Sequence, residues 1–184
     1  LYSSAASDVY KRQYEEIAAA KEAARTFVSG LAPNDLVAVV AFRGDQGEVN
    51  LDEPFPQINP NREILFTSDK AAVLALIDGL GVPSRVAGRT PLYDALFKAI
   101  RMTSHVSGVD YRFVMAFTDG NEKCRDCGGS ILKQNDPINE ANKTGVPVFT
   151  IGLGDQADED YLKRVALTSG GTYHYTPTPD RLAE

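Results

Sequence analysis

The chain lacks the features that mark several large classes of protein. It has two cysteines in 184 residues, too few for a disulfide-stabilised scaffold. No apolar run approaches the ~20 residues that a membrane-spanning helix needs. Acidic residues outnumber basic ones by 25 to 19, and like charges do not cluster. The chain therefore offers no basic patch to nucleic acid or to an anionic membrane, and we expect neither a nucleic-acid partner nor membrane insertion by this segment.

Short catalytic motifs are also missing. The sequence contains no phosphate-binding glycine loop of the type G-x-G-x-x-G or G-x-x-x-x-G-K, and no G-x-S-x-G nucleophile elbow. The two histidines, His105 and His174, do not neighbour a candidate nucleophile in sequence. We interpret them as a residue at the end of a helix and a residue on the surface of a strand.

What the chain does have is the composition of a soluble globular domain, with 43% hydrophobic and 24% charged residues. Its length is that of a single domain with one core. Apolar residues at helical spacing predict helices, some of them with capping signals such as Ser68 before the second. The predicted helices span residues 14–30, 69–80, 91–104, about 135–144, and 158–169.

Between these helices lie short runs that are rich in β-branched and apolar residues. They are continuous rather than alternating, as in LVAVVAF and RFVMAF, which is typical of parallel strands buried on both faces. The order of strands and helices predicts a doubly wound α/β fold with a mostly parallel sheet. The predicted strands span residues 36–42, 112–117, 146–153 and 171–176, with an antiparallel edge strand near 48–51.

Two oxygen-bearing side chains are expected at the carboxyl edge of this sheet, where ligands bind in such folds. The strand 112–117 runs into Asp119, and the helix before that strand begins after Thr90. Because this helix must run down from the edge to which the strand returns, Thr90 and Asp119 converge there. A hydroxyl and a carboxylate are hard ligands that suit Mg²⁺, Mn²⁺ or Ca²⁺.

Each of these residues also has a purely structural interpretation. Thr90 precedes a proline, and Thr-Pro is an ordinary helix start in which the threonine accepts hydrogen bonds from first-turn amides. Asp119 precedes a glycine, and Asp-Gly is a common turn after a strand. Position alone does not separate the two interpretations.

Five segments in order resemble von Willebrand factor type A domains. GRTPLYDAL (88–96) is similar to the loop whose threonine binds a metal, and FVMAFTDG (113–120) to the strand that ends in a metal-binding aspartate. The remaining segments are DLVAVVAF, GVPVFTIGLG and SGGTYHYTPTPDRLAE. The resemblance implies a Rossmann-like fold and a metal-ion-dependent adhesion site with Thr90 and Asp119 as ligands. It also implies a partner-binding face that includes Gly88, Arg89, Gly120 and Asn121.

The chain departs from the family at its beginning. The family opens with a central strand ending in Asp-x-Ser-x-Ser, which supplies further metal ligands, and nothing here fits that pattern. Residues 1–13, LYSSAASDVYKRQ, instead resemble a translated sequencing adaptor at the broken end of a bacterial metagenomic reading frame. We predict a non-native tail over 1–13, disordered or helical, before an incomplete domain over 14–184. The alternative is a divergent member with a polar N-terminal arm.

A cysteine pair, Cys124 and Cys127, follows Asp119. Without a second pair or nearby histidines it is half of a zinc site at most, so we favour a structural role in a surface loop. The pair would form a disulfide if the protein is exported and a dithiol if it is cytosolic. The loop borders the expected ligand face, so it could also affect the choice of partner.

The resemblance implies a non-enzymatic module for protein interaction and adhesion, in which the metal binds an acidic side chain of a protein partner. One alternative is a subunit of a metal-chelatase or AAA-ATPase assembly, where such domains also occur. Another is a hydrolase that uses Asp119. We expect Mg²⁺, or Mn²⁺ or Ca²⁺, in the intact parent and weak or absent metal binding in this chain. The localisation is open, with an extracytoplasmic site favoured over the cytoplasm.

Overall fold

The computed structural model describes residues 3–42, 66–80, 91–118, 130, 132–154 and 157–176. Within them lie five helices and three strands. The helices are α1 (Ser3–Gly30), α2 (Lys70–Gly79), α3 (Leu92–Ser104), α4 (Asp136–Thr144) and α5 (Glu159–Ser169). The strands are β1 (Val114–Thr118), β2 (Val148–Leu153) and β3 (Tyr173–Thr176).

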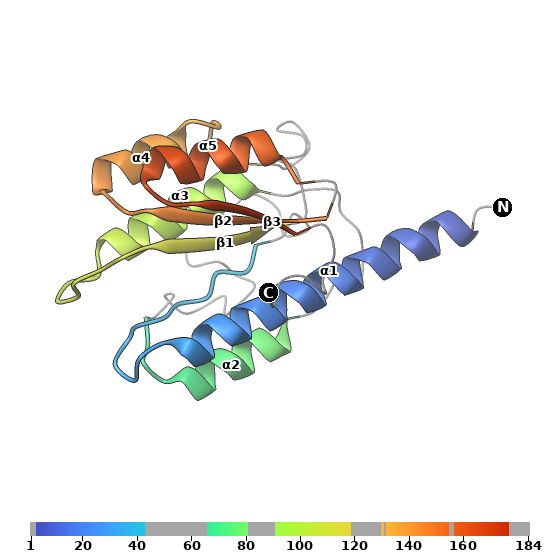
Figure 1. Ribbon diagram of the computed structural model, residues 1–184, viewed down its shortest axis with the longest axis horizontal. Helices are drawn as coiled ribbons and strands as arrows, with labels where there is room; N and C mark the ends of the chain where they lie inside the picture. The colour runs from blue at the N-terminus through green and yellow to red at the C-terminus, as the bar shows by residue number, and fades with distance from the viewer. Residues whose placement is uncertain are drawn as a thin grey trace.

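The three strands form a parallel sheet in the order β1-β2-β3. Val114 pairs with Val148 at the start of β1, and Thr150 pairs with Tyr173 at the start of β3. Helix α4 connects the first two strands and α5 the last two, as parallel pairing requires. Figure 1 shows α3, α4 and α5 covering one face of this sheet, with α1 and α2 on the other side. The predicted α/β fold with a parallel sheet is confirmed.

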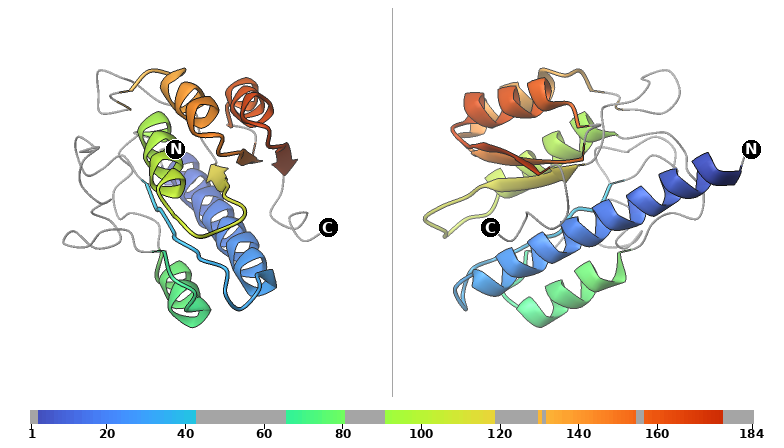
Figure 2. Two further views of the ribbon diagram at one scale, coloured as in Figure 1. Left: turned by 90° about the vertical axis from the view of Figure 1, so that its left-hand side faces the viewer. Right: turned by 45° about the vertical axis from the view of Figure 1, so that its right-hand side comes forward.

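Two hydrophobic clusters lie in these two layers. The larger one joins the sheet to α3, α4 and α5, and it contains the fully buried side chains of Leu92, Val148 and Leu162. The smaller one joins α1 to α2 through Val28, Val73 and Ile77. Helix α1 lies beside α2 in both views of Figure 2.

Helix ends follow the local sequence. Asp69 and Asp158 cap α2 and α5 by accepting hydrogen bonds from first-turn amides. The prediction of Ser68 as the cap of α2 was therefore wrong by one residue. At the other end, Gly145 and Gly170 end α4 and α5 in the left-handed conformation, with φ of 70° and 84°. Glycine adopts this conformation without the steric cost that other residues bear.

The segment 36–42 differs from its prediction. It is extended, but its only bridge among the described residues is the antiparallel pair Val37–Thr67. Residues 37–42 are half-buried, and Leu36 is 42% exposed, so the segment is not a strand buried on both faces. Among the described residues no strand pairs with β1 on the side away from β2. Without a neighbouring strand, an apolar run has no backbone partners with which to form a ladder.

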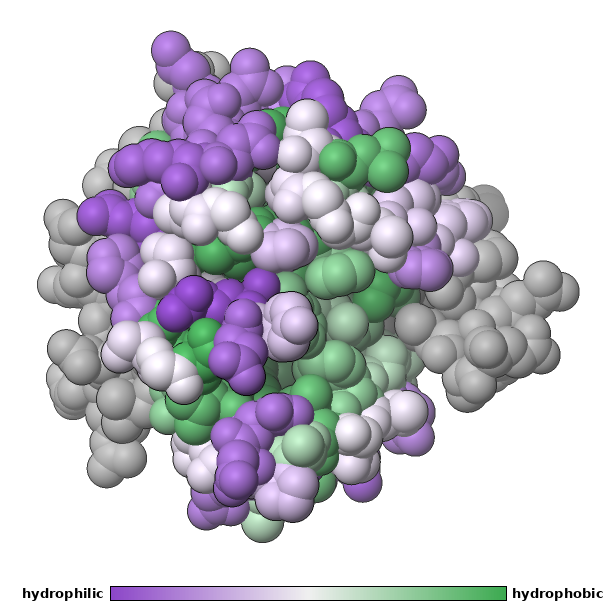
Figure 3. All heavy atoms as spheres, turned by 60° about the vertical axis from the view of Figure 1, so that its left-hand side comes forward, coloured by the Kyte–Doolittle hydropathy of each residue, from purple (hydrophilic) through white to green (hydrophobic). Residues whose placement is uncertain are grey.

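The side of the molecule that Figure 3 brings forward carries a concentration of hydrophobic residues. They gather in a hollow over its middle, between hydrophilic surfaces above and below. Large hydrophobic side chains that stay partly exposed include Leu36 and Phe113, at 42% and 40%. Phe113 directly precedes β1, which has no strand partner on the side away from β2 within the described part of the chain.

Residues 3–13 are helical and continue into the predicted helix 14–30, so that α1 has 28 residues. The sequence predicted that 1–13 would not supply the central strand, and the described part of this segment contains none. The predicted edge strand near 48–51 lies outside the described residues. Within the described residues no helix has the length and apolar character to cross a membrane.

Candidate functional site

The start of α3 and the end of β1 lie at the same end of the sheet. In Figure 1, α3 begins on the side toward which the arrow of β1 points, and it runs back against the direction of that strand. Pro91, at the start of α3, is buried, and Thr118, the last residue of β1, is 4% exposed. These two residues directly adjoin Thr90 and Asp119 in the sequence.

The residues proposed as metal ligands, as the partner-binding face and as a cysteine pair all lie outside the described residues. They are Thr90, Asp119, Gly88, Arg89, Gly120, Asn121, Cys124 and Cys127. The roles assigned to them stay predictions, and the structure informs them through the neighbouring residues.

Helix α3 is capped by a residue far along the chain. Its N-cap residue, Pro91, makes no side-chain capping bond. Instead the hydroxyl oxygen of Ser130 accepts hydrogen bonds from the backbone amides of Tyr93 and Asp94, at 2.9 and 3.2 Å. Ser130 is 2% exposed and follows the β1 strand by 12 residues. The first-turn amides that a local cap would satisfy are therefore bonded to another segment.

The return contact comes from Asp94. Its side chain is fully buried, and its carboxylate accepts a hydrogen bond from the backbone amide of Leu132 at 2.9 Å. The carboxylate also lies in the first turn of α3, where the partial positive charge of the helix end stabilises a negative group. Ser130 and Asp94 thus form a reciprocal clamp, which we name the Asp94–Ser130 clamp, between α3 and the segment at 130–132.

Sequence reasoning missed this clamp. Asp94 lies in a helix whose predicted inward face is apolar, and Ser130 follows two glycines in a segment without periodicity. The two residues are 36 positions apart, so no local capping pattern links them. The one local signal in the sequence was the aspartate in the first turn of α3, because an acidic residue there can stabilise the helix N-terminus.

Two further carboxylates at this end of the sheet, those of Asp158 and Glu159, have structural partners. Helix α5 begins there, after β2, and Asp158 accepts a hydrogen bond from the amide of Tyr161 at 3.1 Å. Glu159 forms an ion pair with Lys163 at 2.8 Å, which raises the pKa of the lysine. Within the described residues, no three histidine, cysteine, aspartate or glutamate side chains gather as a metal site would require.

Tyr173, on β3, lies beside this ion pair. Lys163 is positioned over its ring, 5.2 Å from the centroid. Burial raises the pKa of the Tyr173 phenol to about 12, and the negative charge of Glu159 is the second cause. Both effects favour the neutral phenol, because the phenolate would lose hydration and face a carboxylate.

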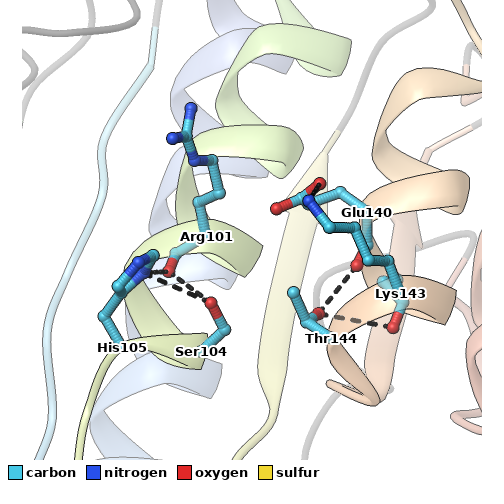
Figure 4. Close-up of polar contacts among 7 residues, drawn as sticks. Arg101, Ser104, His105, Glu140, Lys143 and Thr144 are labelled. Carbon is cyan, nitrogen blue, oxygen red and sulfur yellow. Dashed lines mark hydrogen bonds and ion pairs between the residues drawn. The ribbon is translucent and has the colours of Figure 1, made fainter.

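Both histidines have the structural positions expected from the sequence. Figure 4 shows His105 at the end of α3, close to Ser104 and to the Arg101 carbonyl, which is 2.6 Å from its Nδ1 atom. This is the opposite end of α3 from Pro91. His174 is exposed on β3, and its Nε2 atom lies 3.2 Å from the Thr172 hydroxyl. Neither residue is a ligand candidate at the carboxyl edge near α3.

Comparison with solved structures supports the fold. The structure is similar to a von Willebrand factor type A protein from Catenulispora acidiphila, with a TM-score of 0.67 and 20% identity. It is also similar to proximal thread matrix protein 1 from the mussel byssus, with a TM-score of 0.64 and 19% identity. The alignments cover 95% and 94% of this chain, but only 37% and 42% of those chains. The chain therefore spans less than half the length of either protein.

A search of curated proteins found no match. The sequence matches the family model of the von Willebrand factor type A domain over residues 7–184, nearly its whole length. The match, the parallel sheet flanked by helices and the similar solved structures agree with one another. The chain belongs to the von Willebrand factor type A domain family.

Proposed function

We propose that this domain binds a protein partner through a divalent cation held at the carboxyl edge of the sheet, with Thr90 and Asp119 as its ligands from this segment. Domains of this family generally act as protein-interaction modules. In this proposal the cation, when bound, supplies a positive charge to which an acidic side chain of the partner binds. The residues of the chain hold the cation and shape the surface around it.

One observation carries the proposal, and it concerns the capping of α3. A threonine before a proline is ordinarily explained by hydrogen bonds to first-turn amides. Here the amides of Tyr93 and Asp94 donate to Ser130 instead. A cap at Thr90 would accept from the amide of Leu92 or of Tyr93, so the structural interpretation of Thr90 loses one of its two donors, the amide of Tyr93. This favours the alternative interpretation of its hydroxyl as a metal ligand.

The chemistry of the donor set fits a hard cation. Thr90 and Asp119 offer a hydroxyl and a carboxylate oxygen, which suit Mg²⁺, Mn²⁺ or Ca²⁺. Among the described residues, Asp94 in the first turn of α3 is bonded to the amide of Leu132, and His105 lies at the far end of α3. The described surroundings thus add no soft ligand that would favour zinc or copper.

The affinity of this chain should be low. Mg²⁺ requires near-octahedral coordination, and two protein ligands with water give no better than roughly millimolar affinity. The serines near the N-terminus, Ser3, Ser4 and Ser7, belong to helix α1 and not to a loop that follows a strand. They do not reproduce the Asp-x-Ser-x-Ser loop of the family.

We infer a non-enzymatic role, since the chain lacks the nucleophile and phosphate-binding motifs of α/β enzymes.

An extracytoplasmic location is part of the same proposal. It predicts that Cys124 and Cys127 form a disulfide, which mass spectrometry after thiol alkylation would detect. A role as a subunit of an ATPase assembly stays the alternative for the intact protein.

The test restores the missing ligands. A family-type strand ending in Asp-x-Ser-x-Ser is grafted ahead of Tyr14, and Mg²⁺ and Mn²⁺ are titrated by calorimetry. Binding should strengthen on grafting and disappear in the grafted Asp119→Ala variant. The matched control is Asp110→Ala, which removes an exposed carboxylate before β1 rather than after it. Unchanged binding in the grafted Asp119→Ala variant, or micromolar binding by the ungrafted chain, would contradict the proposal.

A further inference from the structure

The start of α3 is held by contacts of two different kinds. Along its length, Leu92, Leu96 and Ile100 pack into the large hydrophobic cluster. Such apolar contacts are non-directional, so they hold the helix against the sheet without fixing its position along its axis closely. At its first turn, the three hydrogen bonds of the Asp94–Ser130 clamp have defined lengths and angles.

We propose that Asp94 and Ser130 are positioning residues for the metal site. This inference rests on the proposed function. The clamp fixes the first turn of α3, which follows Thr90 directly, relative to the segment at 130–132. Thr118, the residue before Asp119, is positioned independently of the clamp by its register with Gly152 in β2. The separation of the two ligands therefore depends on where the clamp holds α3.

The burial of the clamp indicates why directional bonds matter there. Asp94 is 0% exposed and Ser130 is 2% exposed. Burying a carboxylate is unfavourable unless hydrogen bonds compensate it, and an apolar residue would fill the same space at lower cost. A carboxylate and a hydroxyl fix the geometry between two segments through hydrogen bonds, which an apolar pair cannot form. Ligands need such support to stay within the tolerances of a metal site.

The segment held by the clamp continues into α4. Lys133 donates its amide to Asp136, the first residue of that helix, at 2.7 Å. Helix α4 packs through Ile138 and Ala141 into the same cluster as α3. The clamp thus anchors the start of α3 to an element that is itself fixed on the sheet.

The test uses the full chain and Mn²⁺, whose paramagnetism broadens nearby amide signals even at millimolar affinity. The amides of Leu92 and Thr118, which flank the two ligands, are followed by NMR during a Mn²⁺ titration. Ser130→Ala should weaken the apparent affinity by roughly tenfold or more, as loss of a supporting residue around a metal site does. Ser130→Thr, which retains the hydroxyl, should bind as the unmodified chain does.

The matched control is Ser169→Ala. Ser169 likewise accepts a backbone hydrogen bond through its hydroxyl, from the amide of Val148 at 2.9 Å, but in the last turn of α5. This variant should lose about as much stability in urea as Ser130→Ala does. Its Mn²⁺ affinity should stay within about twofold of that of the unmodified chain, because substitutions at distant sites act independently. A loss of affinity in this control equal to that of Ser130→Ala would show a general effect of stability and would overturn the inference.

The remaining outcomes separate this inference from the proposed function. If Asp119→Ala removes the broadening but Ser130→Ala does not reduce it, the positioning role is wrong and the metal site stands. If the unmodified chain shows no broadening at Leu92 or Thr118, the titrations are repeated in the grafted chain, and the absence of broadening there as well overturns the proposed function and the inference with it. Should Ser130→Ala not fold, Asp94→Leu decides, because leucine fills a similar space but has no acceptor for the amide of Leu132. Weakened binding in Asp94→Leu supports the inference, and unchanged binding overturns it.

Discussion

Phe27 and Phe113 contact each other edge to face, with ring centroids 5.8 Å apart and an angle of 83° between the rings. Phe113 makes a similar contact with Phe149 on β2, at 5.6 Å. Phe27 belongs to α1, so this row of three aromatic rings connects the α1–α2 layer to the sheet. Phe27 packs against the smaller hydrophobic cluster and Phe149 lies on β2, so the row runs from that cluster to the sheet.

Replacing Phe27 should therefore weaken the attachment of α1. Phe27→Ala removes a half-buried ring and its edge-to-face contact, and we expect a loss of about 2 kcal/mol in the free energy of unfolding, less than a fully buried phenylalanine costs. Urea denaturation measures this loss. The comparison variant is Leu167→Ala, at a position 71% exposed, which should change stability by less than about 0.5 kcal/mol. Equal losses in the two variants would show that the aromatic row does not join the layers.

A backbone contact makes Gly171 irreplaceable. A Cβ atom at this position would lie 2.0 Å from the carbonyl oxygen of Val148, a clash that only backbone movement could relieve. We expect Gly171→Ala to cost about 3 kcal/mol or more, at the upper end of overpacking effects. The matched variant is Gly79→Ala, at the end of α2, where nothing lies within 4 Å of an added Cβ. Its stability should change by less than about 1 kcal/mol, and thermal unfolding of both variants would reveal the contrast.

The pKa of Tyr173 predicts a loss of stability in strong base. Its phenol ionises at a pKa of about 12 in the folded chain, against an ordinary value of 10. The unfolded chain therefore releases this proton first, and the contribution of Tyr173 to stability, full below pH 10, is lost as the pH rises from 10 to 12. Tyr173→Phe should lose less stability over this range than the unmodified chain. The measurement is urea denaturation at successive pH values, with phenolate absorbance recorded in parallel.

Glu159→Gln separates the two causes of this shift. Removing the carboxylate should lower the pKa of Tyr173 while burial, the larger cause, keeps it above 10. An unchanged pKa in this variant would mean that the carboxylate does not act on the phenol.

Hydrogen exchange should report on the edge of β1 that has no strand partner among the described residues. Val114 donates its amide to Pro147 at 2.9 Å, so in a parallel ladder the amides of Val114 and Ala116 point to β2. The amides of Met115 and Phe117 point the other way, where no described strand pairs. We expect these two amides to exchange faster than those of Val114 and Ala116. Equal protection along β1 would show that another segment pairs with this edge.

The elements of this fold follow from local pattern. Helical spacing of apolar residues in 91–104 and 158–169 predicted α3 and α5 to within about a residue at each end, because a single buried face decides where such a helix packs. Continuous apolar runs predicted β1 and β2, the short segment 171–176 was predicted as the last strand, and the alternation of strands and helices predicted their parallel pairing. The same reasoning was wrong for 36–42, since a strand needs a neighbour, and pairing is a property of the sheet rather than of the run.

The sequence by itself determined the family and the parallel sheet, and it predicts two oxygen-bearing residues, Thr90 and Asp119, at the carboxyl edge of that sheet. Only the tertiary structure revealed that Ser130 caps α3 and that Asp94 returns the contact to Leu132. The physical reason is the separation of the partners along the chain. Periodicity and capping patterns describe neighbours within a few residues, whereas a hydroxyl 36 positions away reaches a helix end only after both segments have packed on the sheet.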